Sequence, residues 1–160
     1  MRLGLRALLL MSLAACSAGD KGSQSDSAFA QLQKRGATVM GVDQYSSQHV
    51  FEPLPDGGRI VLQRQEDDSA GTAAIREHMW KISQAFAAGD FTLPGVVHAM
   101  TDVPGTQQMR ELRNEITYTA QDLPRGGEVV ISTTNPKAVA AIHDFLAFQR
   151  MDHRAGAHMK

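Results

Sequence analysis

The stretch LPDGGRIVL (residues 54–62) recurs as LPRGGEVVI (residues 123–131), and this pair of segments predicts the fold. Each copy places Pro, a charged residue and Gly-Gly between two apolar runs. This pattern is typical of a β-hairpin whose glycines supply the positive φ angles of a tight turn. A helical pattern follows each hairpin, and its Ala-Ala-Ile at residues 73–75 recurs at residues 140–142. The sequence therefore predicts the unit ββα, present twice.

The fold class that follows is α+β: a duplicated ββα unit that forms a four-stranded antiparallel sheet with two helices on one face. The repeat units span about residues 48–88 and 115–153. Alternation along a strand puts Ile60 and Leu62 on one face, and helical spacing gives each helix an apolar stripe to pack against that face. The stripes consist of Ile75, Met79, Ile82 and Phe86 in the first helix and of Val139, Ile142, Phe145 and Leu146 in the second.

The helix ends and the connection between the units complete this prediction. Ser69 is expected to cap the first repeat helix, and Asn135, followed by Pro136, is expected to cap the second. Residues 90–105 carry Pro, Gly and short apolar runs between the two units. Because the other face of the sheet also carries apolar residues, we expect residues 90–105 or a second subunit to cover it.

The N-terminus predicts export and lipid anchoring. Arg2 and Arg6 precede a short apolar run that ends in LAAC at Cys16, the only cysteine of the chain. This is the pattern of a secretory signal peptide. LAAC resembles the lipobox of bacterial lipoprotein precursors, in which the thiol is acylated with palmitate or related chains and the protein is cut before the cysteine. The resemblance implies that residues 1–15 are a signal peptide and that Cys16 is the anchor.

By the same resemblance, the protein lies in the cell envelope of a bacterium, lipid-anchored and facing the periplasm. Ser17, rather than Asp, follows the cysteine, which favours the outer over the inner membrane. We expect a flexible tether over residues 16–27, with a short helix after it that ends at Gly36. A single α+β domain should span residues 28–153, and residues 154–160 should form a flexible tail.

Composition limits the partners of this chain. It has 16 Lys and Arg against 17 Asp and Glu, a formal net charge of −1. No basic face is expected, so nucleic acid is excluded as a partner. The expected partner is the lipid bilayer, bound through acylated Cys16, with a second copy of the chain or another envelope protein as further candidates.

Catalytic motifs are absent from the sequence, whereas histidine and methionine are frequent. Neither the Gly-x-Ser-x-Gly pattern nor Gly-x-Gly-x-x-Gly nor a P-loop occurs, so we identify no catalytic residue and do not expect an enzyme. With Cys16 acylated, a metal would have to be held by His, Met or carboxylates. The chain has six His and eight Met, and imidazole with thioether favours copper, the thioether selecting the reduced ion.

The candidate metal ligands centre on His98 and Met100. In an extended segment, residues two apart project to the same side, so these two could hold one ion. His78 and Met109 are the expected further ligands, and His49 and His153 are possible additional ones. Strand alternation predicts that His49 faces the helices, where it could meet His78, and helical spacing predicts that His153 is turned inward.

Three functions remain open at this point, the third being an enzyme of unrecognised type. The first is a membrane-anchored envelope lipoprotein whose domain binds a ligand, with copper or a similar soft metal as the leading candidate. The alternative is a non-catalytic structural or protein-interaction lipoprotein, in which these histidines only pack in the core or bond to helix ends.

A second resemblance rests on MGVDQY (residues 40–45), FLAFQ (residues 145–149) and DHR (residues 152–154). These segments resemble those of small bacterial envelope proteins, some of which are labelled aspartate carbamoyltransferase. The Ser-x-Arg-Thr-Arg loop that binds carbamoyl phosphate in that enzyme does not occur in this chain. The resemblance therefore implies an envelope protein, and it brings no catalytic residues.

Overall fold

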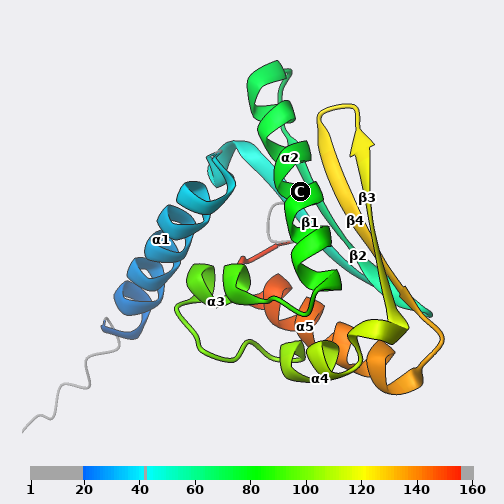
Figure 1. Ribbon diagram of the computed structural model, residues 1–160. Coiled ribbons are helices and arrows are strands. Elements are labelled where there is room, and N and C mark those ends of the chain that lie inside the picture. The colour runs from blue at the N-terminus through cyan, green and yellow to red at the C-terminus, as the bar shows by residue number, and fades with distance from the viewer. Residues whose placement is uncertain (1–19, 42, 156–160) are drawn as a thin grey trace, which may run out of the picture.

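Two β-hairpins joined along their second strands form one four-stranded sheet, which lies to one side of the helices (Figure 1). The computed structural model describes residues 20–41 and 43–155. All neighbouring strands are antiparallel, in the order β1-β2-β4-β3. The strands are β1 (Ser47–Leu54), β2 (Gly57–Arg64), β3 (Ile116–Leu123) and β4 (Gly126–Thr133). The predicted α+β class with a four-stranded antiparallel sheet is confirmed.

Helices surround one face of this sheet. Two of them pack on it, α2 and α5, while α3 contacts α1 and α4 contacts α5. The α-helices are α1 (Asp20–Met40), α2 (Ser69–Ala87), α3 (Thr92–His98), α4 (Thr106–Glu111) and α5 (Pro136–Asp152). Short 3-10 helices, η1 (Gln44–Ser46) and η2 (Arg113–Glu115), lead into β1 and β3.

The helix of each ββα unit packs mainly on the hairpin of the other unit. Helix α2 follows the first hairpin but lies against β3 and β4, and α5 follows the second hairpin but lies against β1 and β2. Glycines in the strands receive these helices. A β-carbon at Gly127 of β4 would lie 3.3 Å from Met79 Cγ of α2, and one at Gly58 of β2 would overlap Leu146 Cδ1 of α5. The two units therefore share one core.

The two hairpins have the same length and the same register. Ile60 of β2 lies opposite Val129 of β4, its equivalent in the sequence repeat. The last residue of each second strand donates its backbone N–H to a turn carbonyl of the other hairpin: Arg64 to Arg125 at 2.8 Å, and Thr133 to Asp56 at 2.9 Å. Two copies of one structural unit should match in this way, in strand length, in register and in the hydrogen bonds at their strand ends. The origin of the two units by duplication stays a prediction.

The glycine pairs do not form the turns as we predicted. The turn residues are Pro55-Asp56 and Pro124-Arg125, and Gly57 and Gly126 begin β2 and β4. Gly57 has a positive φ of 148°, whereas Gly126 does not. Glycine is needed at both positions because β2 and β4 approach each other closely. A β-carbon at Gly126 would overlap Leu62 O and lie 2.8 Å from Gln63 Cα.

The first helix is longer than the sequence predicted. The tether expected over residues 16–27 is wrong for residues 20–27, which belong to α1, and the helix continues past Gly36 to Met40. Leu32, Gly36 and Met40 are spaced four residues apart on one buried face. Packing of this face outweighs the roughly 1 kcal/mol by which glycine disfavours a helix. The signal peptide, Cys16 and residues 156–160 lie outside the described residues.

The flexible tail predicted from residue 154 is wrong for Arg154 and Ala155, the part of it that the structure describes. Arg154 has a left-handed φ of 51°, and its guanidinium donates to Asp26 of α1 at 3.0 Å and lies over the ring of Phe29. These contacts fix the end of α5 to the beginning of α1. Over residues 20–41 and 43–155, no helix is long and apolar enough to cross a membrane.

Residues 90–105 do not cover the other face of the sheet. They form α3 and its flanking turns on the helical side, where Arg35 of α1 donates to Val97 O at 2.7 Å. The opposite face carries an ion cluster in which Arg59 lies 2.5 Å from Glu52 and 3.6 Å from Glu128. Our expectation for this segment was wrong, because its apolar side chains pack on the helical side instead, with Phe91 stacked on Phe86 of α2 and in edge contact with Phe145 of α5.

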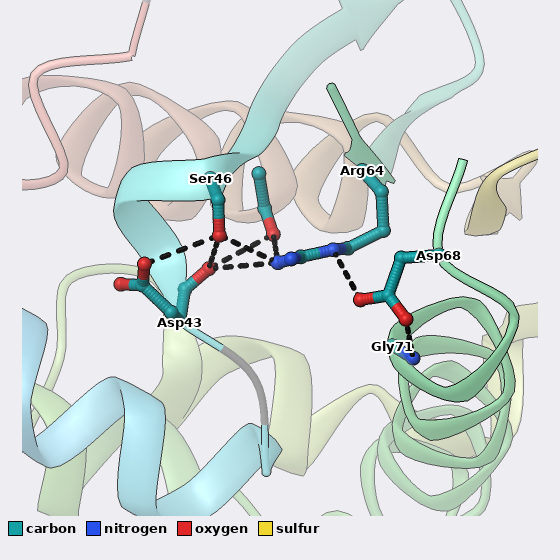
Figure 2. A network of polar contacts seen from close by, with 6 residues as sticks. Asp43, Ser46, Arg64, Asp68 and Gly71 are labelled. Carbon is teal, nitrogen blue, oxygen red and sulfur yellow. Dashed lines mark hydrogen bonds and ion pairs between the residues drawn. The ribbon is translucent and has the colours of Figure 1, made fainter. Parts of the chain in front are cut away.

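Arg64 joins the entry of β1 to the beginning of α2 (Figure 2). Its Nη1 donates to Ser46 Oγ at 2.8 Å, and its Nε lies 3.1 Å from Asp68 Oδ2. Asp68 also caps α2 by accepting from Gly71 N at 3.0 Å, so the cap is Asp68 and not Ser69. At the second helix Asn135 caps as predicted, accepting from Lys137 N at 2.9 Å.

Gly126→Ala should lower the free energy of unfolding by about 3 kcal/mol, because its β-carbon would push β2 and β4 apart. Gly127→Ala is the matched control. Its β-carbon would lie 3.2 Å from Gln121 O and otherwise meet the flexible Met79 side chain, so a loss below about 1 kcal/mol is expected. Urea unfolding measures both losses. Equal losses would show that the close approach of the strands does not limit stability.

Candidate functional site

Four of the six histidines line one cavity of about 70 Å³ between the sheet and helices α1, α2, α3 and α5. They come from separate parts of the chain: His49 from β1, His78 from α2, His98 from α3 and His153 from the end of α5. The rest of the wall is mostly apolar and includes two methionines, Met40 and Met79. We call this the histidine cavity. Its volume is several times that needed to hold one water molecule.

Three rings packed against one another form one wall of the histidine cavity. The ring centroid of His153 lies 5.2 Å from that of His49 and 5.4 Å from that of Phe51. His49 and Phe51 lie opposite Leu62 and Ile60, so they face the helices, as strand alternation predicted for His49. His153 is turned inward, also as predicted. Its Nδ1 is buried and has no hydrogen-bond partner among the described residues.

His98 is held by two residues of α5. Its Nδ1 lies 2.5 Å from Asp152 Oδ2, and its Nε2 lies 2.9 Å from Gln149 Oε1. The edge of its ring meets His153, with centroids 5.1 Å apart. The side chain is only 1% exposed. Because both of its nitrogens are engaged, His98 has no nitrogen free for a ligand. Its ring is held in place and packs against the ring of His153, which it helps to position.

Burial favours the neutral form of His49, His78 and His153. It lowers the pKa of His49 from 6.5 to about 4, with a further contribution from His78. It also lowers the pKa of His78 to about 4, assisted by the charge of Lys81. The pKa of His153 falls to about 2, again mainly through burial and then through His49 and His98. Neutral imidazole is the form that binds metal ions, so these side chains need lose no proton to act as ligands.

The structure separates part of the predicted metal set. His98 ends helix α3, and Ala99 follows it with a left-handed φ of 53°, so the extended conformation expected for His98 and Met100 is wrong. Met100 is 40% exposed and lines a shallow surface pocket with Arg110. Met109 is fully buried in the core and does not line the histidine cavity. Of the proposed ligands, the structure brings together His49, His78, His98 and His153.

Sequence reasoning missed the two methionines of the cavity and the partners of His98. Met40 was missed because the helix was expected to end at Gly36, and Met79 was assigned only to the apolar stripe of α2. Gln149 and Asp152 are three residues apart on α5, which places them on one side of the helix. That spacing was a usable signal, but nothing in the sequence placed it beside α3.

The other histidine that the structure describes has a structural role. His143 Nε2 lies 2.9 Å from Leu54 O and 3.0 Å from Gly57 O, at the turn of the first hairpin. The sixth, His158, is outside the described residues. His143 therefore holds α5 to the β1–β2 turn and does not reach the histidine cavity.

The geometry limits what the histidine cavity can bind. In the described part of the chain, no three His, Cys, Asp or Glu side chains are grouped so that they could hold a metal ion. An ion in this cavity would therefore need a thioether beside at most two imidazoles. Thioether ligands select soft ions such as Cu(I) and are poor ligands for Mg²⁺ or Ca²⁺.

Stability should decrease as the pH falls from 7 to 5. His49, His78 and His153 have lowered pKa values in the folded state, so below pH 6.5 the unfolded chain binds more protons than the folded one. The stability that comes from keeping these three imidazoles neutral is fully present above pH 6.5 and is lost as the pH falls toward 4. Urea unfolding at pH 7, 6 and 5 measures the loss. His78→Leu removes one group and should flatten this dependence, and an unchanged slope would contradict the assignment.

Comparison with protein-family models, with curated proteins and with solved structures found no match to this chain. No residue role is therefore transferred from another protein.

Proposed function

We propose that this protein is a lipid-anchored envelope protein whose domain binds one soft metal ion, with reduced copper as the leading candidate, in the histidine cavity. One observation carries the proposal. Four histidines from four separate segments converge on a single cavity that two methionines also line. A core that only needed packing would be more stable with apolar residues there, because burying polar nitrogens without partners is unfavourable.

The ligands that the geometry favours are His49 and His153 with a thioether. Their ring centroids are 5.2 Å apart, and neither ring makes a hydrogen bond to a described residue. Met40 and Met79 both line the same cavity and can supply the sulfur. His78 lines the same cavity and is an alternative imidazole ligand. This mixture of neutral nitrogen and thioether donors suits Cu(I) better than harder ions.

His98 acts in this proposal as a positioning residue. Asp152 and Gln149 fix both of its nitrogens, and its ring edge holds the ring of His153 in place. Indirect support of this kind is common at metal sites, where the groups behind the ligands decide their orientation. His98 should therefore influence the affinity for copper without binding the ion.

His153→Phe should weaken Cu(I) binding at least tenfold, about 1.4 kcal/mol, because it keeps the ring stack but removes the nitrogen ligands. The apo protein should keep its melting temperature or gain stability, since the buried Nδ1 without a partner is removed. Anaerobic titration against a Cu(I) chelator measures the affinity. Met40→Leu and Met79→Leu test the thioether, and the exposed Met151→Leu is their matched control.

A wild-type domain that takes up no copper at micromolar concentrations would remove this function. The alternative would then be favoured, a non-catalytic structural or protein-interaction lipoprotein. Full retention of affinity in His153→Phe, with uptake by the wild type, would place the ion elsewhere in the chain. Met100→Leu should leave the affinity unchanged, because Met100 lies outside the histidine cavity.

The lipid anchor is the second part of the proposal. It is supported by LAAC ending at Cys16, and α1 begins only four residues later, at Asp20. Four residues span at most about 14 Å. An acyl group on Cys16 would therefore hold the beginning of α1, and the end of α5 that Arg154 ties to it, close to the bilayer surface. Several acyl chains anchor a protein far more firmly than one.

Cys16→Ser should abolish acylation and release the protein from the membrane fraction. Labelled palmitate should enter the wild type and not the variant, and fractionation should recover the variant as unprocessed or soluble protein. Copper binding by the folded domain should be unchanged, so this experiment is independent of the metal site. A wild-type protein that incorporates no label would end the lipoprotein proposal.

A further inference from the structure

A second, larger cavity of about 450 Å³ runs along the outer edge of β1. Residues 47–53 of the strand form one wall, Phe29 and Gln33 of α1 form another, and Arg150 and Ala155 close it at the end of α5. We call this the edge groove. It shares only His49, Phe51 and His153 with the histidine cavity, so it is a distinct space.

The edge groove exposes unpaired backbone groups of a strand. β1 is the first strand in the sheet order, so one of its edges has no strand beside it in the described part of the chain. Leu54 and Gly57 flank the two-residue turn and pair with each other. Counting back from Leu54 to Gln48, every second residue of β1 therefore makes the backbone hydrogen bonds to β2. His49 and Phe51 then direct their N–H and C=O groups to the open edge. Pro53, which lacks an N–H, occurs at an outward position, where edge strands tolerate proline.

Two side chains of the edge groove also lack partners. Gln33 is 9% exposed, and its buried Oε1 accepts no hydrogen bond from a described residue. Three charged residues line the groove. Of these, Glu52 is paired with Arg59, and Arg154 is paired with Asp26. Arg150 makes no ion pair with any residue that the structure describes, so the groove carries an unmatched positive charge.

We propose that the edge groove binds an extended, acidic peptide segment of a partner protein, which adds to β1 as a strand and places a carboxylate near Arg150. Backbone pairing with His49 and Phe51 would supply affinity, and contacts with Phe29 and Phe51 would select an apolar neighbour of the acidic residue. The cavity volume of about 450 Å³ suits a short peptide stretch.

Shape and charge decide against two other occupants. A second copy of this chain would have to bring in the edge of a folded sheet, and α1 and the end of α5 wall the groove on two sides. The chain's own residues 156–160, GAHMK, follow directly from Ala155 but carry a positive lysine and no acidic side chain. They do not match the charge of Arg150.

The test begins with a phage-displayed heptapeptide library panned on the folded domain. Selected peptides should combine an acidic residue with apolar neighbours. A synthetic copy of the best one, added to the labelled domain, should slow amide exchange at His49 and Phe51, whose N–H groups face the groove. The amide of Val50, which already bonds within the sheet, should change little.

Charge reversal supplies the matched variants. Arg150→Glu should weaken binding of the selected peptide at least fivefold, and Lys137→Glu, an exposed charge at the other end of α5, should change it less than twofold. Gln33→Leu should weaken binding while raising the melting temperature, because it removes a buried oxygen without a partner. Copper affinity is read in the same samples, so loss of one function is distinguishable from loss of the other.

Three results would overturn the proposal. One is a library that yields no acidic peptide, and another is equal weakening by Arg150→Glu and Lys137→Glu. The third is protection of the His49 and Phe51 amides without any peptide. If deleting residues 156–160 removes that protection, the occupant is the tail. If dilution removes it, the occupant is a second copy of the chain.

Discussion

The close approach of β2 and β4 is the constraint on which the rest of the structure depends. It requires glycine where each of these strands begins, since a β-carbon at Gly126 would overlap Leu62 O. It also sets the positions of both outer strands, because β1 and β3 pair in the same register on either side. The next glycine in each strand, Gly58 or Gly127, leaves the space into which a helix of the other unit packs. Gly57 and Gly126 thus set the spacing of the two strands, and Gly58 and Gly127 leave room for α5 and α2.

This exchange of helices is what builds the histidine cavity. Because α5 crosses to the first hairpin, its end brings His153 against His49 of β1, more than a hundred residues earlier in the chain. The connection between the units then adds His98, which Asp152 and Gln149 hold. None of these contacts lies within one ββα unit alone. The cavity therefore forms only when both units and the connection have folded together, and a partly folded chain would lack it.

The sequence predicted which way side chains face more successfully than it predicted which residues they contact. Alternation and helical spacing showed correctly that His49 and His153 face inward, and the glycine repeat predicted the sheet. Which inward residues meet depends on the crossing of the helices, and no local pattern reports it. The errors have local causes too. Gly36 was taken as a helix end because its burial against neighbouring segments was invisible in the sequence. His98 and Met100 were separated by a left-handed turn at Ala99, a conformation that alanine rarely adopts.

The stacked wall of His49, Phe51 and His153 is common to the histidine cavity and the edge groove. The side chains of His49 and Phe51 face the histidine cavity, and their backbone N–H and C=O groups face the edge groove. One short segment of β1 therefore lines both spaces. A strand added along β1 would restrict His49 and Phe51, and an ion held by His49 and His153 would restrict the same rings from the other side. Any coupling between the two sites must be reciprocal, and these three rings are the contact through which it would act.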